Sequence, residues 1–348
     1  MNERDLLALM KIAAGADPSA PVTYSIEGQT VTMSYQAVQE TLRKELNSLA
    51  SDKYTYEANR PKIFKLIEQT ATEVVPQNLI SRYGQFAEVQ RFQLGDRPVF
   101  TRRLGRMRAK QFVTTVGAAG VYETFKLDKE SFEVKTSAHG TAVEISLYDF
   151  LTGRLDFGEM LQIVVEGMDE RIYREIAVAL MRSINQLPAA NKINTNGFDE
   201  KSFDALLATA RVYGQPTIYT SYEFATKIIP QTGWISDNMR DQMWAQGHLG
   251  NYKGSNVVIL PNSFEDETNS RKIIDPGYTW IIPTGADGKP VKVAFEGGLN
   301  MRELDNRPDW SRHIDMFQQV GVGVMLTNNI CSYVDSSLAG HLENPYKE

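Results

Sequence analysis

Cysteine is nearly absent from this sequence, whose 348 residues include one, Cys331. A single thiol excludes an internal disulfide framework and is typical of a protein that stays in a reducing compartment. Because Cys331 lies in the apolar run Val324–Val334, we expect a buried, unreactive side chain. Histidine is also scarce, and no histidine has the spacing of a metal-binding pair. The histidines are His139, His248, His313 and His341.

Long apolar runs are missing as well. No stretch approaches the roughly 20 apolar residues that cross a bilayer. The N-terminal sequence has early acidic residues, and Lys11 interrupts its short apolar run, unlike the order of a signal peptide. We therefore expect a cytoplasmic product that does not associate with membranes.

Motifs for catalysis and cofactor binding are absent too. The sequence has no G-x-x-x-x-G-K-[ST] phosphate loop and no G-x-S-x-G elbow, and Gly117–Gly120 falls short of a dinucleotide fingerprint. The acidic residues Glu265–Glu267 lie in a polar, loop-like stretch typical of a solvated surface. We expect no catalytic, cofactor-binding or metal-binding residues. An enzyme with a dispersed active site stays open as an alternative, because catalytic groups can converge from distant positions.

The charge that is present is unevenly distributed. The net charge of −6 argues against a protein that mainly grips nucleic-acid phosphates. The segment Arg91–Gln111, the basic run, nevertheless has a net charge of +6 against −12 for the remaining chain, with one acidic residue, Asp96. Its basic residues are Arg91, Arg97, Arg102, Arg103, Arg106, Arg108 and Lys110.

Two interpretations of the basic run are open. It could bind single-stranded nucleic acid, with Phe92, Phe100 and Phe112 stacking on bases. Alternatively, it could be an arm that docks on an acidic surface of another copy, where charge complementarity fixes the register. We favour the second interpretation, because an isolated hairpin is marginal in water and needs a surface to lie on.

The first part of the chain predicts an N-terminal arm followed by an extended excursion. Strands at 22–26 and 30–34 form a hairpin, and Ser34 caps a helix that ends near Leu49. After a polar joint, a second helix begins at Pro61. From Phe86 to Val121 the irregular, glycine-marked pattern predicts two extended strands, at 88–101 and 111–116.

A long helix follows, over Phe157–Leu187. Asp156 and Glu159 have the spacing of a capping box, apolar residues recur every three or four positions, and Pro188 ends the pattern. Such a helix exceeds the usual globular length, so we expect something to lie along it. Its carboxylates are candidate acceptors for the basic run: Glu159, Glu166, Asp169, Glu170 and Glu175.

The remaining chain alternates helices and strands, which predicts an α+β fold with a middle domain inserted into a scaffold. We expect a hairpin between Thr279–Ile282 and Val291–Phe295, around Asp287-Gly288. One long strand or two should cover Met316–Val334. The other predicted elements are strands at 132–135, 142–147, 216–220 and 257–260, and helices at 201–212, 221–229 and 237–246.

This layout resembles the Hong Kong 97-type major capsid proteins of tailed phages. The resemblance rests on the order and spacing of four segments: FAEVQRFQLGDRPVFTRR (86–103), the strands and capped helix of 122–172, PTIYTSYEFATKI with LGNYKGSNVVILPNSF (216–264), and VGVGVMLTNNICSYVD (320–335). It implies an extended two-stranded loop, a peripheral domain with a long spine helix, and an axial domain. The implied boundaries are an N-terminal arm at 1–60, a peripheral domain at 61–85, 122–199 and 313–340 with the spine helix at about 157–187, an extended loop at 86–121, an axial domain at 200–312 and a tail at 341–348.

The function that the resemblance implies is a non-enzymatic one. The chain would be a major capsid protein whose hexamers and pentamers form the icosahedral shell around a phage genome. It would assemble in the host cytoplasm and reside in the virion, with scaffolding, portal or decoration proteins as further partners. The alternatives are an encapsulin-like nanocompartment shell and the cytosolic enzyme named above.

Overall fold

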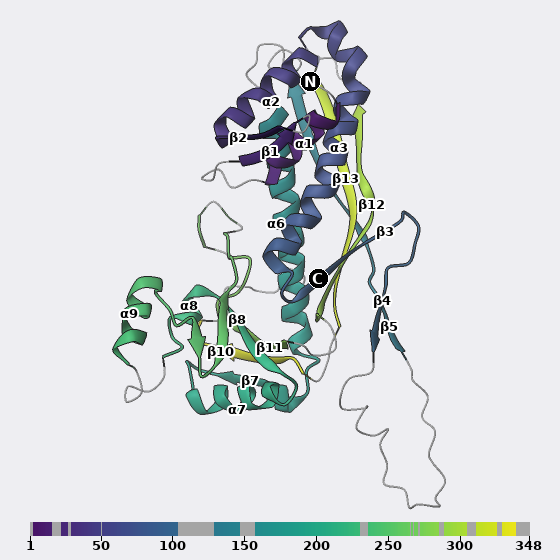
Figure 1. Cartoon of the computed structure of the whole chain (residues 1–348). Helices are drawn as coiled ribbons and strands as arrows, with labels where there is room; N and C mark the ends of the chain where they lie inside the picture. The colour runs from purple at the N-terminus through teal and green to yellow at the C-terminus, as the bar shows by residue number, and fades with distance from the viewer. Residues whose placement is uncertain are drawn as a thin grey trace, which may run out of the picture. The chain divides into compact units, whose positions relative to one another are not determined.

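The computed structural model describes residues 3–15, 22–26, 29–49, 51–103, 129–146, 157–229, 236–264, 266, 268–270, 272–284, 289–304, 311–325 and 329–338. The chain divides into two compact units, which are described separately (Figure 1). Unit 1 consists of Met1–Pro98, Val134–Tyr173 and Val293–Val322, and unit 2 of Val99–Glu133, Arg174–Lys292 and Gly323–Glu348.

Three helices form the first part of unit 1. They are α1 (Glu3–Gly15), α2 (Tyr35–Leu49) and α3 (Lys53–Tyr83). The predicted N-terminal hairpin is confirmed as β1 (Val22–Ile26) and β2 (Gln29–Met33). Helices α1 and α2 pack against α3 and against each other through buried apolar side chains. Those side chains are Leu6, Leu9, Met10 and Ala13 on α1 and Val38, Leu42 and Leu46 on α2.

The prediction that the second helix begins at Pro61 was wrong, because α3 begins eight residues earlier, at Lys53. Asp52 caps it, since its carboxylate accepts a hydrogen bond from the Thr55 amide at 2.9 Å. The first turns are also tied to α2, because Asn59 Nδ2 donates to the Leu49 carbonyl at 3.0 Å. Pro61 is therefore an interior residue of α3, where it cannot donate the amide hydrogen bond of a regular helix.

A four-stranded sheet, with the strand order β3-β12-β13-β6, completes unit 1. Its strands are β3 (Ala87–Phe92), β12 (Val291–Leu304), β13 (Ser311–Val324) and β6 (Ser137–Ser146). Helix α3 is hydrogen-bonded to β12, because Thr72 Oγ1 accepts from Leu299 N at 3.0 Å and Glu68 Oε1 from Met301 N at 2.8 Å.

The predicted long helix is confirmed as α6 (Phe157–Ile184), which is about 42 Å long at 1.5 Å per residue. It ends before Pro188, as the sequence indicated. Asp156 of the predicted capping box lies outside the described residues. In unit 1 the Tyr173 ring of α6 stacks on the Tyr83 ring of α3, with centroids 4.8 Å apart.

Unit 2 is built around a six-stranded mixed sheet in the order β7-β14-β11-β8-β10-β9. Helix α7 (Glu200–Arg211) covers one face of this sheet (Figure 1). The core between them is rich in aromatic rings, among them Phe203, Phe224 and Tyr333. The strands are β7 (Lys192–Thr195), β8 (Gln215–Thr220), β9 (Asn251–Tyr252), β10 (Ser255–Ile259), β11 (Tyr278–Thr284) and β14 (Cys331–Asp335). Short helices are η1 (Ala189–Asn191), α8 (Tyr222–Ala225) and α9 (Asp237–Gln246).

The predicted hairpin between Thr279–Ile282 and Val291–Phe295 was wrong. β11 lies between β14 and β8, so both of its edges already have partners, and β12 belongs to the four-stranded sheet. Asp287-Gly288 lies outside the described residues. The predicted helix at 221–229 is also shorter, since α8 ends at Ala225.

The closing segment forms two strands in different sheets. β13 pairs with β6 in unit 1, whereas β14 inserts between β7 and β11 in unit 2. The sequence-based division, which assigned both strands to the peripheral domain, stays a prediction. The α+β class predicted from the sequence is confirmed.

Candidate assembly surface

The basic run begins on a strand that is anchored to α3. Phe86 and Ala87 are buried, and the Arg91 guanidinium donates a hydrogen bond to the Thr72 carbonyl. A turn follows β3, in which Gly95 has a φ of 90°, a value that favours glycine. Leu94 in this turn is largely exposed and lies beside Gly297 of β12.

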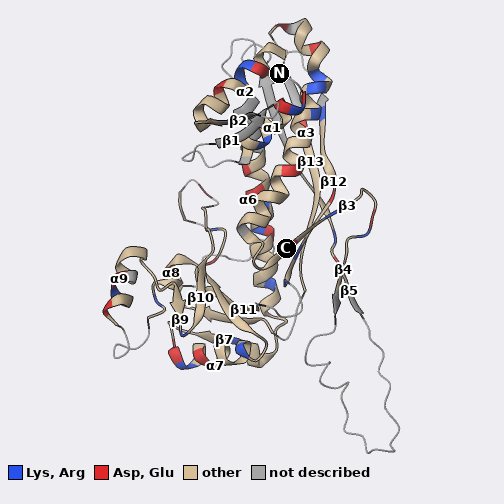
Figure 2. Ribbon diagram, viewed as in Figure 1, with Lys and Arg blue, Asp and Glu red and all other residues tan. Residues whose placement is uncertain are grey.

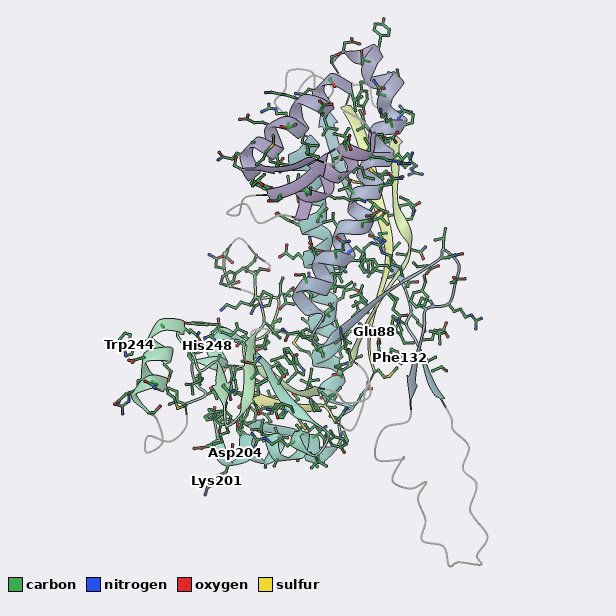
Figure 3. The ribbon with its side chains drawn as sticks, viewed as in Figure 1. Glu88, Phe132, Lys201, Asp204, Trp244 and His248 are labelled. Atoms are coloured by element: carbon green, nitrogen blue, oxygen red, sulfur yellow. The ribbon has the colours of Figure 1, made fainter. Side chains whose placement is uncertain are left out.

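The next two strands form a sheet of their own. β4 (Val99–Arg103) and β5 (Lys129–Glu133) pair antiparallel from Val99↔Glu133 to Arg103↔Lys129, and we call this pair the β4–β5 ladder. Within the described residues, neither strand pairs with a third one. Phe100 and Phe132 are register partners, and the Lys292 ammonium lies 5.6 Å from the centroid of the buried Phe100 ring. Figure 3 labels Phe132 on β5 and Glu88 on β3.

One carboxylate of β12 joins the two segments of unit 1 that lead into β4 and out of β5. Glu296 Oε1 accepts a hydrogen bond from the Gly95 amide at 2.8 Å, and Glu296 Oε2 accepts one from Thr136 Oγ1 at 2.6 Å. We call this arrangement the Glu296 bridge. The hydrogen bonds from Thr136 and Gly95 hold the pKa of Glu296 below its usual range. Beside the bridge, Val134 N donates to the Pro98 carbonyl at 3.0 Å, so the residue before β4 is tied to the residue after β5.

Only some residues of the basic run lie in the described part of the chain. Arg91 lies on β3, and Arg97 is exposed in the turn before β4. The backbone of β4 includes Arg102 and Arg103, whose register partners are Glu130 and Lys129. Their side chains are outside the described part of the chain, and so are the whole residues Arg106, Arg108 and Lys110.

The candidate acceptors on α6 differ in their exposure. Glu166 and Glu170 are exposed, Glu175 is half-buried, and the side chain of Glu159 is outside the described part. Asp169 is buried and accepts a hydrogen bond from Asn78 Nδ2 at 3.2 Å, so it serves the interior of unit 1. Figure 2 shows that α6 also carries basic residues, which offset part of its negative charge. They are Arg171, Arg174 and Arg182.

In unit 2, three charged side chains pair with one another, namely Lys253, Asp204 and Glu200. Lys253 Nζ lies 2.5 Å from Asp204 Oδ2 and 2.7 Å from Glu200 Oε1, both on α7, and Figure 3 labels Asp204 there. Tyr252 Oη donates to Asp204 Oδ1 at 3.1 Å. Although desolvation opposes it, hydrogen bonds to Asp204 and Glu200 raise the pKa of Lys253. This cluster fixes the turn between β9 and β10 on α7.

Sequence reasoning missed the Glu296 bridge. Gly95 and Glu296 are 201 residues apart, so no local spacing connects them. One signal was present, since Glu296 directly follows the apolar run Val291–Phe295, and a carboxylate on a buried strand needs hydrogen-bond donors. The sequence does not identify those donors.

Among the described residues, no group of three or more His, Cys, Asp or Glu side chains could hold a metal ion. Within the same part of the chain, no helix is long and apolar enough to cross a membrane.

Comparison with known families identifies the chain. A family model described as "SPbeta prophage-derived putative capsid protein YonB" matches residues 11–335. The chain belongs to this family. The YonB family match thus covers α2, α3, both large sheets and the β4–β5 ladder.

Solved structures provide more distant likenesses to this YonB family chain. The mature capsid of bacteriophage PhiM1 has 11% identity and a TM-score of 0.49, with 73% of this chain and 86% of that one covered. The capsid of cyanophage P-SCSP1u gives the same identity and TM-score, with 73% and 88% covered. The holo-SrpI encapsulin complex from Synechococcus elongatus PCC 7942 has 12% identity and a TM-score of 0.45, with 71% and 84% covered. No curated protein sequence matches significantly. The assignment of the chain to the YonB family rests on the family match and not on these structural likenesses.

Proposed function

We propose that the chain is a major capsid protein that self-assembles into the icosahedral shell enclosing a phage genome. Membership of the YonB capsid family over residues 11–335 is the observation that carries this proposal. The prophage origin of the family supports a phage particle over an encapsulin-like nanocompartment or a cytosolic enzyme. The chain would therefore act without a catalytic site or a cofactor, as a structural part of the virion.

The proposed shell consists of hexamers and pentamers whose contacts are individually weak and collectively stable. In this arrangement the basic run of one subunit lies on the acidic side of α6 in a neighbouring copy. The β4–β5 ladder supports such a contact, because a two-stranded sheet is marginally stable until another surface covers it. The donor residues are Arg91, Arg97, Arg102, Arg103, Arg106, Arg108 and Lys110, and the acceptors are Glu159, Glu166, Glu170 and Glu175.

The domain division also becomes part of this proposal. The arm, the extended loop, the peripheral domain and the axial domain keep the boundaries given above, except that β14 moves to the axial domain with the sheet that contains it. Assembly would take place in the host cytoplasm, with scaffolding, portal or decoration proteins as further partners. The net charge of −6 supports a wall that does not grip the packaged genome tightly.

Electron microscopy tests the proposal directly. The purified chain should form capsomers or closed shells, visible by negative staining and as large species in light scattering. A chain that stays strictly monomeric at all salt concentrations and protein concentrations would contradict the capsid function.

A charge-reversal variant tests the docking contact. Arg102→Glu with Arg103→Glu should abolish assembly while the subunit stays folded, because the changed side chains would repel an acidic surface. The matched control is Lys201→Glu with Arg240→Glu, which changes the net charge equally at exposed positions of α7 and α9. Circular dichroism checks the fold of both variants. Normal particles from the first variant would exclude the basic run as a docking segment.

A further inference from the structure

Glu296 is a buried acidic residue on the inner strand β12 of the four-stranded sheet, with 9% of its surface exposed. Both of its carboxylate oxygens are used, one by the Gly95 amide and the other by Thr136 Oγ1. Hydrogen bonds to a charged acceptor are stronger than those between neutral groups. The side chain therefore makes a well-defined link between β12 and two other segments.

Those two segments flank one end of the β4–β5 ladder, where Val99 pairs with Glu133. Gly95 lies in the turn that leads into β4, and Thr136 lies in the link between β5 and β6. The described part of the ladder has no third strand, so its pairing depends on how the segments that lead into it are held together. Leu94 beside Gly297, and the hydrogen bond from Val134 N to the Pro98 carbonyl, hold the same segments.

We propose that Glu296 is a positioning residue for shell assembly, whose carboxylate holds together the two segments of unit 1 that lead into and out of the β4–β5 ladder. This inference rests on the proposed function, because the ladder carries part of the basic run that is to reach a neighbouring copy. Glu296 acts through the backbone of Gly95 and the hydroxyl of Thr136, and it makes no contact with the neighbour itself.

The expected effect falls on assembly more than on the fold of the subunit. Without the bridge, the two strands still pair with each other, and the helices of unit 1 and the six-stranded sheet of unit 2 keep their cores. A loosely held ladder must become ordered when it docks. The free-energy cost of that ordering weakens the binding between subunits.

Thr136 offers an experiment that leaves the carboxylate in place. Thr136→Val keeps the shape of the side chain but removes the hydroxyl that donates to Glu296, whereas Thr136→Ser retains it. We expect Thr136→Val to raise the critical concentration for assembly about tenfold, as loss of one charge-assisted hydrogen bond would, and Thr136→Ser to restore it. Light scattering against subunit concentration measures this value.

Glu296 itself gives the complementary series. Glu296→Ala should impair assembly more than Glu296→Gln, whose amide keeps two polar atoms in nearly the same places. The control is Asp315→Asn, which removes a carboxylate of the neighbouring strand β13 that pairs with Arg302 and not with the ladder. Its critical concentration should stay within about twofold of the wild-type value.

Hydrogen exchange separates positioning from general stability. Glu296→Ala and Thr136→Val should speed exchange of the Gly95 amide and of the ladder, with exchange in β8 and β11 unchanged. If the wild-type chain forms shells and Glu296→Ala and Thr136→Val also assemble normally, this inference is overturned while the proposed function stands. Equal acceleration across the whole unit would also overturn it, since Glu296 would then be a general stabiliser. Failure of the wild-type chain to assemble would instead refute the proposed function.

Discussion

Asp335, the last residue of β14, has a carboxylate that is fully buried in unit 2. Its Oδ1 accepts hydrogen bonds from the amides of Gly197 at 2.8 Å and Ser337 at 2.9 Å, and from Ser337 Oγ at 2.6 Å. Lys227 Nζ lies 3.3 Å from Oδ2. Burial by itself would raise the pKa of Asp335, but the bonds from Ser337 and Gly197 and the charge of Lys227 hold it below its usual range.

Asp335→Asn should therefore reduce the free energy of unfolding by about 3 kcal/mol at neutral pH, because it breaks a buried, hydrogen-bonded ion pair. The pKa is lower in the folded chain than in the unfolded one, so this stabilisation is present above about pH 4 and is lost as the pH falls through the folded value. Urea titrations of both proteins at several pH values measure the difference.

That difference should shrink on acidification, and a difference that grows would contradict the assignment. Asp237→Asn is the control, because Asp237 forms an exposed pair with Arg240 on α9. It should change the free energy of unfolding by less than about 0.5 kcal/mol.

Gly321 illustrates a steric requirement at a single position. A Cβ on this residue of β13 would lie 2.5 Å from the Lys135 carbonyl oxygen and 2.9 Å from Val134 Cγ1, next to the base of the ladder. Gly321→Ala should destabilise unit 1 by about 2 kcal/mol, since backbone would have to move. Thermal unfolding measures this cost.

Gly167 provides the matched control for that variant. It lies on an exposed position of α6, and a Cβ there would meet nothing within 4 Å. Gly167→Ala should raise stability by up to about 1 kcal/mol, because alanine favours helix. Equal effects of the two changes would show that the close approach at Gly321 is unimportant.

Single residues could be predicted from the sequence where their immediate neighbours decide the outcome. Cys331 lies in an apolar run, and it is indeed buried, with desolvation raising its pKa to about 12. The roles of Asp335 and Glu296 could not be predicted, since their partners Gly197 and Gly95 are 138 and 201 residues away.

At the scale of elements, the β4–β5 ladder should change most on assembly. Amides of 99–103 and 129–133 should exchange quickly in the free subunit, because a lone two-stranded sheet opens easily, and slowly in the shell. Amides of β8 and β11, both inner strands, should be protected in either state. Mass spectrometry of free and assembled protein measures this change, and identical ladder exchange in both would show that assembly leaves the ladder uncovered.

Elements with local signals were predicted well. Helix α7 follows a capping residue, Asp199, and has a regular apolar stripe, and both features are readable from the sequence alone. The hairpin between β11 and β12 was wrong because turn residues indicate a reversal of the chain and do not reveal which strands compete for an edge. β8 and β14 occupy both edges of β11, and only tertiary structure decides that competition.

For the whole molecule, charge separation predicts salt-sensitive assembly. The basic run has a net charge of +6 and the rest of the chain −12, so contacts between copies gain from attraction between exposed charges. Raising the salt concentration from about 0.05 M to about 0.5 M should increase the critical concentration for assembly, since screening shortens the range of such attraction. Light scattering at each salt concentration measures this trend. A critical concentration that falls with salt would indicate that apolar contacts dominate the shell.

The long separation between Gly95 and Glu296 also sets an order of events during synthesis. The chain grows from its N-terminus at about 5–20 residues per second, so Glu296 follows Gly95 out of the ribosome after roughly 10–40 s. We expect the Gly95 amide to exchange quickly in ribosome-bound chains until β12 has emerged, and more slowly afterwards. Nascent subunits on neighbouring ribosomes would then lack the Glu296 bridge, which confines shell growth to nearly finished chains.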